Sequence, residues 1–152
     1  MIHDGKDAYG GHLEQFRSGD VIKHWPGKTI TEMDNHLFCL LTMNHNPLHL
    51  DEEYMKSHQH GKVLVVGLLV LSLVVGMSVK DTSGKAVANL EYERITHDAP
   101  VFQGDTIYAE TEILEAKESK SRSDRGIVYL ESRGFNQHDK KVLTVRRRFL
   151  VP

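Results

Sequence analysis

The sequence predicts an α+β fold in which an antiparallel β-sheet wraps around one long apolar helix. The first observation is an uncharged run of 17 residues, 63–79, whose length and composition fit a buried helix. The second is the alternation of apolar and polar residues at 107–113 and 127–132, which is the pattern of half-buried strands. Because a helix that is apolar on every side must be covered on every side, we expect the sheet to curve around it.

The other elements are predicted from capping and turn signals. Thr31 and Asp34 have the spacing of a capping box, so we expect a helix from there to about Thr42. Asp51, followed by two glutamates, is typical of the start of a short helix. The remaining predicted elements are a strand at 21–25, the long helix at about 65–79, and strands at 86–96, 106–117, 126–136 and 142–150.

Length and composition indicate a single domain, residues 12–152, behind a flexible N-terminal arm, residues 1–11. The chain is 39% hydrophobic and 26% charged, with a net charge of −2. Nucleic-acid binding is not expected, because a chain with this slightly negative net charge has no excess of basic residues to attract phosphate groups. The apolar run is shorter than the ~20 residues of a membrane span, so we expect no membrane partner. Residues 1–11 lack the apolar core of a secretory signal, which favours a cytoplasmic location.

The number and placement of cysteines and histidines limit the kinds of disulfide, nucleophile and metal site that we expect. The single cysteine, Cys39, excludes an internal disulfide, and its apolar neighbours favour a packed thiol over a nucleophile. The ten histidines are scattered and include no pair with zinc-ligand spacing that is backed by cysteine or carboxylate partners. We therefore expect no metal and no cofactor.

The most informative segment is the run 40–51, in which polar, turn-forming residues and a histidine lie between two apolar stretches. Its histidine, His49, has an unperturbed pKa of about 6.5, which suits proton transfer at neutral pH. His49 is therefore our candidate general acid and base. The alternative is a histidine that only holds the loop in place.

Three motifs resemble one known family. The run Asn44-His45-Asn46-Pro47-Leu48-His49-Leu50-Asp51 is similar to the Asp-x-Asn-Pro-x-His-x-Asp catalytic loop of (R)-specific enoyl-CoA hydratases, which are MaoC-like proteins with the hot-dog fold. Residues 100–106 resemble that family's Pro-Val-x-x-Gly-Asp-Thr run, and Gly67 resembles its glycine at the entry of the long helix. The similarity spans about 19–151. Residues 31–35, 41–44 and 87–90 look closer to one branch, the mesaconyl-CoA hydratases, also called β-methylmalyl-CoA dehydratases.

The resemblance implies a hot-dog homodimer or higher oligomer that hydrates or dehydrates a CoA thioester, with its substrate tunnel at or near the subunit interface. The branch handles short branched dicarboxylic acyl groups such as mesaconyl-CoA. By this resemblance His49 is the base and acid, and the backbone N–H of Gly67 stabilises the enolate oxygen. A packing role for Gly67 stays open. Asn46 and Pro47 are substrate-binding candidates, although shaping the loop is the simpler role.

The sequence departs from the family at Asn44, where the hydratases have a catalytic aspartate. An amide cannot take up a proton at neutral pH, so Asn44 is expected to orient water or substrate, or only to stabilise a turn. Apart from Asp51, Asp34 is the nearest aspartate in the sequence that might replace the missing acid, but a capping role fits it better. Asp51 has two interpretations, an N-cap and a hydrogen-bond partner of His49.

Two rival functions follow from these residues. The same fold hosts thioesterases, and the loss of the acid at Asn44 would also fit a non-catalytic acyl-CoA-binding protein. A further question is Arg146-Arg147-Arg148 in the last strand, where alternation places Arg147 on the opposite face from the other two. One of the three is a candidate to bind a substrate carboxylate, and a surface role is equally open.

Overall fold

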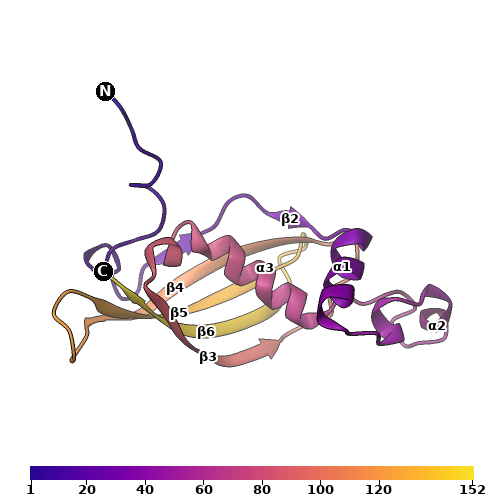
Figure 1. The fold of residues 1–152 in the computed structure, drawn as a ribbon. Coiled ribbons are helices and arrows are strands. Elements are labelled where there is room, and N and C mark those ends of the chain that lie inside the picture. The colour runs from indigo at the N-terminus through magenta and orange to yellow at the C-terminus, as the bar shows by residue number, and fades with distance from the viewer.

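The computed structural model describes all 152 residues and shows one long helix lying across an antiparallel sheet (Figure 1). The strand order is β1-β4-β5-β6-β3, and β2 pairs separately with β4. The strands are β1 (Val21–Lys23), β2 (Lys28–Thr29), β3 (Ala88–His97), β4 (Thr106–Glu118), β5 (Gly126–Phe135) and β6 (Lys141–Val151). The helices are α1 (Glu32–Thr42), α2 (Glu52–Lys56) and α3 (Gly67–Val79), with short 3₁₀ turns at Leu13–Gln15, Pro47–His49 and Ser83–Lys85.

The predicted α+β architecture is confirmed, and the bounds of the main elements lie within about two residues of the expected ones. The alternation predicted for the central strands is present, since β5 alternates buried and half-buried residues along its whole length. The buried side of β5 faces α3, and Gly134 lies directly beneath Val74. A methyl group added to Gly134 would lie 2.6 Å from Val74 Cγ2. The sheet and α3 are therefore packed too closely there for a side chain.

The helix-facing side of the sheet holds two separate apolar clusters with polar residues between them. One cluster includes Ala109, Val145 and the two buried valines of α3, whereas the other includes Ile113, Leu130 and Phe149. On each of the three central strands, the buried position between the clusters is polar: Thr111 on β4, Ser132 on β5 and Arg147 on β6. A polar row thus crosses the middle of the core.

The expectation that α3 would be covered on every side is wrong for a single chain. Val70, Val74 and Ser78 face the sheet and are buried, but Leu68 on the other side is 56% exposed. The physical reason is that a single layer of sheet reaches only one side of a helix. Strand β3, at the edge of the sheet, is exposed along its entire length. None of the helices combines the length and apolar character needed to cross a membrane.

The N-terminal segment is tied to the fold near residue 10. Lys85 Nζ donates hydrogen bonds to the carbonyl groups of Lys6, Asp7, Tyr9 and Gly10. The backbone also bonds there, because Gly10 N–H donates to the carbonyl of residue 80. Figure 1 shows the first residues extending away from the sheet beyond this attachment.

Candidate active site

Helix α1 begins with the predicted capping box. The Thr31 hydroxyl accepts a hydrogen bond from Asp34 N (3.2 Å), and Asp34 Oδ2 accepts one from Thr31 N (2.8 Å). The hydrogen bond from the Thr31 backbone, followed by the one from Lys28, holds the pKa of Asp34 below its usual value. Asp34 is thus engaged in the cap and an ion pair with Lys28, and it does not line the cleft described below.

The end of α1 directs the chain into the candidate catalytic loop. Met43 closes the helix in the left-handed conformation (φ 59°). The loop then forms a 3₁₀ turn that carries His49, begins with Pro47 and is capped by Asn46, whose Oδ1 accepts from Leu48 N (3.0 Å). The sequence did not predict this turn, but its cap and proline support the expected loop-shaping roles of Asn46 and Pro47.

The orientation of the His49 ring is fixed by one hydrogen bond. His49 Nδ1 lies 3.0 Å from the carbonyl oxygen of Leu64. Since a carbonyl oxygen only accepts, Nδ1 carries the hydrogen of this bond, and in the neutral ring Nε2 is then the nitrogen that presents a lone pair. His49 is thereby held in the tautomer that a general base needs.

Asn35, on the buried side of α1, connects this loop to the entry of α3. Its Nδ2 donates to the carbonyl groups of His49 (3.2 Å) and Leu64 (3.1 Å), and its Oδ1 accepts from Val66 N (3.0 Å). The residue is completely buried. Sequence reasoning assigned no role to Asn35, because its three partners lie 14 to 31 residues further along the chain.

His49 and the start of α3 share a cleft of about 450 Å³. Its walls are mainly apolar, and three histidines are among the lining residues. The lining residues are His49, His60, Leu64, Val65, Gly67, Val70, His97, Asp98, Ala99, Pro100, Val101 and Val142. Gly67 is the first residue of α3, and its N–H has no hydrogen-bond partner in the structure. A free N–H at the positive end of a 13-residue helix can stabilise an oxyanion.

The Pro-Val run at 100–106 reaches the cleft through the backbone. Val65 N donates to the carbonyl of Val101 (2.8 Å), and Leu64 pairs with Phe102 in an isolated bridge. These contacts hold the segment before α3 against the segment before β4. All three motifs in the sequence therefore contribute residues to the lining of one cleft.

The predicted site residues divide into two groups. His49 and Gly67 both line the cleft, whereas Asn44, Asn46 and Pro47 do not. Asn44 is half-buried, and its Oδ1 accepts from Asn46 N at 3.3 Å. This bond supports a turn-stabilising role, and the water-orienting role of Asn44 stays a prediction.

Two further histidines in the cleft, His60 and His97, were not singled out from the sequence. His60 makes an edge-on contact with the Phe102 ring, at 5.8 Å between centroids. His97 is the last residue of β3, and its ring lies against Gly67. Both residues belong to a scattered set of ten histidines, and no local pattern distinguishes them from the others.

Cys39 and Asp51, which do not line the cleft, have the structural roles predicted for them. Cys39 is fully buried, and burial raises the pKa of its thiol, as expected for a packed cysteine. Asp51 caps α2, with Oδ1 accepting from Tyr54 N at 2.8 Å. Asp51 was expected to be either an N-cap or a hydrogen-bond partner of His49, and the structure shows the N-cap.

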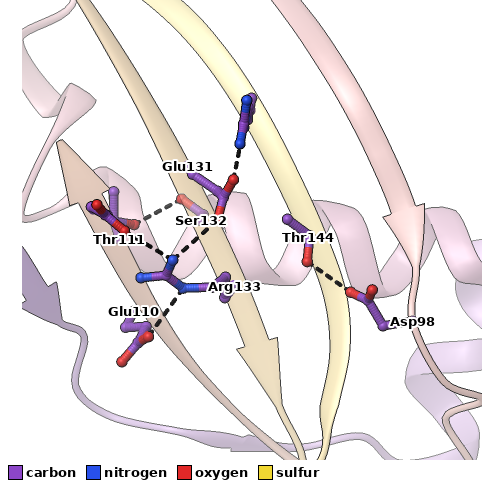
Figure 2. A network of polar contacts seen from close by, with 9 residues as sticks. Asp98, Glu110, Thr111, Glu131, Ser132, Arg133 and Thr144 are labelled. Atoms are coloured by element: carbon purple, nitrogen blue, oxygen red, sulfur yellow. Dashed lines mark hydrogen bonds and ion pairs between the residues drawn. The ribbon is translucent and has the colours of Figure 1, made fainter. Parts of the chain in front are cut away.

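The outer face of the sheet, turned away from α3, carries an ion-pair network (Figure 2). Arg133 contacts Glu110 (3.1 Å), Glu112 (3.0 Å) and Glu131 (3.0 Å), and Glu131 also accepts from Arg146 Nε (2.7 Å). Burial would raise the pKa of Glu131, but its hydrogen bond to Arg146 and the two nearby arginine charges outweigh burial and lower that pKa.

The alternation predicted for the three consecutive arginines is confirmed. Arg146 pairs with Glu131, and Arg148 pairs with Glu91 and Glu93, all on the outer face. Arg147 points the other way and is 1% exposed beneath α3. Arg146 and Arg148 therefore have the surface role rather than a position in the cleft.

The sequence is similar to those of curated hydratases and dehydratases over nearly the whole chain. A mesaconyl-CoA hydratase of Cereibacter sphaeroides is 32% identical over 96% of this chain and 42% of its own length. A β-methylmalyl-CoA dehydratase of Chloroflexus aurantiacus is 33% identical over 93% of this chain and 40% of its own length. This chain thus spans about two fifths of the length of these curated relatives.

Solved structures show the same fold. A monoamine oxidase regulatory protein from Archaeoglobus superposes with a TM-score of 0.82 at 30% identity, covering 93% of this chain and 94% of that one. A conserved hypothetical protein of Mycobacterium tuberculosis, described as a double hot-dog fold, gives a TM-score of 0.84 at 24% identity and covers 99% of this chain and 46% of that one. The chain therefore has the hot-dog fold.

A known domain family matches most of this chain. Residues 15–134 match the MaoC-like domain, which includes the loop of His49, the start of α3 and the Pro-Val run. The chain belongs to the MaoC-like domain family.

Proposed function

We propose that this chain catalyses the reversible hydration of the double bond in an enoyl-CoA thioester. The observation that carries the proposal is the shared cleft, in which His49 is held with Nε2 as a base beside the free N–H of Gly67. The relatives named as mesaconyl-CoA hydratase and β-methylmalyl-CoA dehydratase support the same chemistry.

The reaction needs one base and one oxyanion site. His49 Nε2 takes a proton from water, the water oxygen bonds to the β-carbon, and the π electrons shift to form an enolate at the thioester oxygen. The N–H of Gly67 stabilises the charge on that oxygen. The imidazolium then returns the proton to the α-carbon, so the net change is addition of H and OH. Dehydration is the same path in reverse.

The acyl group proposed is short, branched and dicarboxylic, as in mesaconyl-CoA. Support comes from the names of the two relatives that match over more than nine tenths of this chain. A straight-chain group such as crotonyl is the alternative. Comparing the two substrates tests the acyl group separately from the reaction type.

The functional unit proposed is a homodimer formed through the exposed edge of the sheet. Leu90, Tyr92 and Ile95 on β3 are each more than 40% exposed, and an unpaired apolar edge strand is a surface that proteins normally cover. The outward face of α3 is exposed as well. A second copy would cover both surfaces and take the place of the second half of a double hot-dog chain.

The dimer proposal is tested by the mass of the protein in solution. The double variant Leu90→Lys, Tyr92→Lys should have the mass of one chain by light scattering, whereas the wild type should have twice that mass. Tyr108→Lys is the matched control, because Tyr108 is similarly exposed but lies on the central strand β4. A wild type of single-chain mass would refute the proposal.

Asn44 is the position at which the proposed site differs from that of the (R)-hydratases, which have an aspartate there. Asn44→Asp restores the family's acid, and we expect it to raise the rate on crotonyl-CoA. Abolished activity would instead mean that the amide N–H has a role that a carboxylate cannot fill.

The first experiment follows the enoyl-thioester absorbance of crotonyl-CoA and mesaconyl-CoA with purified protein, and records free thiol in parallel. Loss of the enoyl band without thiol release is the expected result. Thiol release would identify a thioesterase. Binding without either signal would identify a non-catalytic acyl-CoA-binding protein.

A further inference from the structure

We infer that His97 is a second hydrogen-bond donor to the thioester oxygen, next to the N–H of Gly67. The inference rests on the proposed function and adds a residue that the family motifs do not include. Four features of the structure carry it: the strand register, the contact with Gly67, the lack of any other partner for His97, and its place in the cleft.

The register of the sheet turns His97 toward α3. His97 is paired with Leu143 of β6, and Leu143 is a fully buried member of the apolar cluster against α3. Paired residues on neighbouring strands point to the same face. The next residue, Asp98, points the other way, and its Oδ2 accepts from Thr144 on the outer face at 2.7 Å (Figure 2).

The imidazole of His97 lies directly against the first residue of α3. A methyl group added to Gly67 would lie 2.6 Å from His97 Cε1 and 3.0 Å from each ring nitrogen. Gly67 does not have a positive φ, so backbone conformation does not require glycine there. The His97 ring, in the position it occupies here, leaves no room for a side chain at residue 67.

Both donors at this point are free. The N–H of Gly67 has no partner, and no hydrogen bond involves the ring of His97, although neighbouring Asp98 is bonded. An imidazole carries at least one N–H in either protonation state. The two donors both line the cleft that contains His49. An oxygen that accepts from Gly67 would therefore lie beside the His97 ring.

A second donor explains how the site can work without the family's aspartate. With Asn44 unable to transfer a proton, His49 must both accept and return it, and the enolate must persist between the two steps. Two donors on the enolate oxygen stabilise that intermediate more than one does. Loss of one oxyanion donor typically lowers kcat by about 10²–10³.

The test compares two substitutions of similar size. His97→Gln keeps an N–H donor, whereas His97→Leu keeps apolar bulk without a donor. His138→Leu is the matched control, because His138 lies in the exposed turn between β5 and β6. For each protein we would measure kcat, KM and the pH profile on crotonyl-CoA and mesaconyl-CoA. We would also record the ¹³C shift of the bound thioester carbonyl, which reports hydrogen bonding without turnover.

We expect His97→Leu to lower kcat by about 10²–10³ with little change in KM, and to reduce the carbonyl shift. His97→Gln should retain most of kcat and the wild-type pH profile. Normal kcat and carbonyl shift in His97→Leu would overturn the inference while leaving the hydratase proposal intact. Equal collapse of both variants, with one limb of the pH profile lost, would make His97 a proton donor instead. A wild type that neither binds nor hydrates any thioester would refute the proposed function, and this inference with it.

Discussion

Both ends of α3 carry a histidine and other polar groups, but at the C-terminal end these groups are buried and mostly hydrogen-bonded to one another, whereas at the N-terminal end His97 is exposed and Gly67 is half-buried. At the C-terminal end, His24 Nδ1 contacts Asp81 (2.7 Å) and His24 Nε2 contacts the Thr111 hydroxyl (2.7 Å). Thr111 in turn bonds to Ser132 (2.7 Å). At the N-terminal end, the N–H of Gly67 and the ring of His97 have no partners and border a cleft.

Arg147 adds to the network at the C-terminal end, although its buried Nε has no hydrogen-bond partner. Its Nη2 donates to the hydroxyl groups of Ser78 (2.9 Å), Ser83 (3.0 Å) and Thr82 (3.3 Å). No carboxylate pairs with it, and burial lowers the pKa of its guanidinium. These hydroxyl groups lie on or just after the last turn of α3, so Arg147 joins the helix end to β6.

The comparison teaches that donors left free at a cleft, rather than polar residues as such, distinguish the end of the helix at which we propose the active site. A network in which almost every donor has an acceptor stabilises the fold and leaves nothing for a ligand to bind. Substitutions at the N-terminal end should therefore change activity, and substitutions at the C-terminal end should change stability.

The largest expected effect is that of His49→Ala. Loss of the general acid and base should lower kcat by at least about 10², with little change in the melting temperature. The measurement is kcat on the preferred enoyl-CoA with a thermal melt of the same sample. His45→Ala, an exposed neighbour in the same loop, is the control and should keep wild-type activity. Near-normal turnover in His49→Ala would end the mechanism proposed here.

The next effect is expected at Arg147. Arg147→Ala should lower the free energy of unfolding by about 2–5 kcal/mol, because it leaves a cavity beneath α3. Arg147→Met fills that space and removes a buried charge with no carboxylate partner, so it should lose much less. Urea unfolding measures both variants, and kcat should be unchanged. An equal loss in the two variants would show that the guanidinium hydrogen bonds, and not its volume, hold the helix end.

A smaller effect is expected at Thr111, the residue of the polar row on β4. Thr111→Val leaves His24 and Ser132 each without one partner, and should lower the free energy of unfolding by about 1–3 kcal/mol. Thr144→Val on the outer face is the control, with an expected change below about 0.5 kcal/mol. If the two valine variants lose the same stability, burial of the row is not what makes it important.

The smallest effect is expected on the outer face and depends on pH. The folded-state pKa of Glu131 is lowered, so its stabilising contribution is present above the unfolded glutamate pKa and is lost as pH falls through the folded value. Glu131→Gln should therefore be less stable than the wild type at pH 7 and nearly equal to it at pH 3. Urea midpoints at the two pH values measure this. A constant difference between the proteins would contradict it.

Much of the fold and part of the site follow from local sequence patterns. Alternation within β4 and β5, the capping box of α1, and the cap of α2 each depend on residues within a few positions of one another. The motif around His49 and the glycine at the start of α3 likewise identify the two residues that meet in the cleft. Such patterns can be predicted because the interactions they describe are short in sequence.

What only the tertiary structure decided is how distant segments meet. The roles of Asn35, His97 and Arg147 depend on partners 14 to 69 residues away, brought close by the strand register and by the way α3 lies on the sheet. The sequence by itself determined that α3 is apolar all round, but only the structure showed which side one chain covers. The reason is physical: periodicity defines the face that each element buries, whereas packing between elements selects the residues across from it.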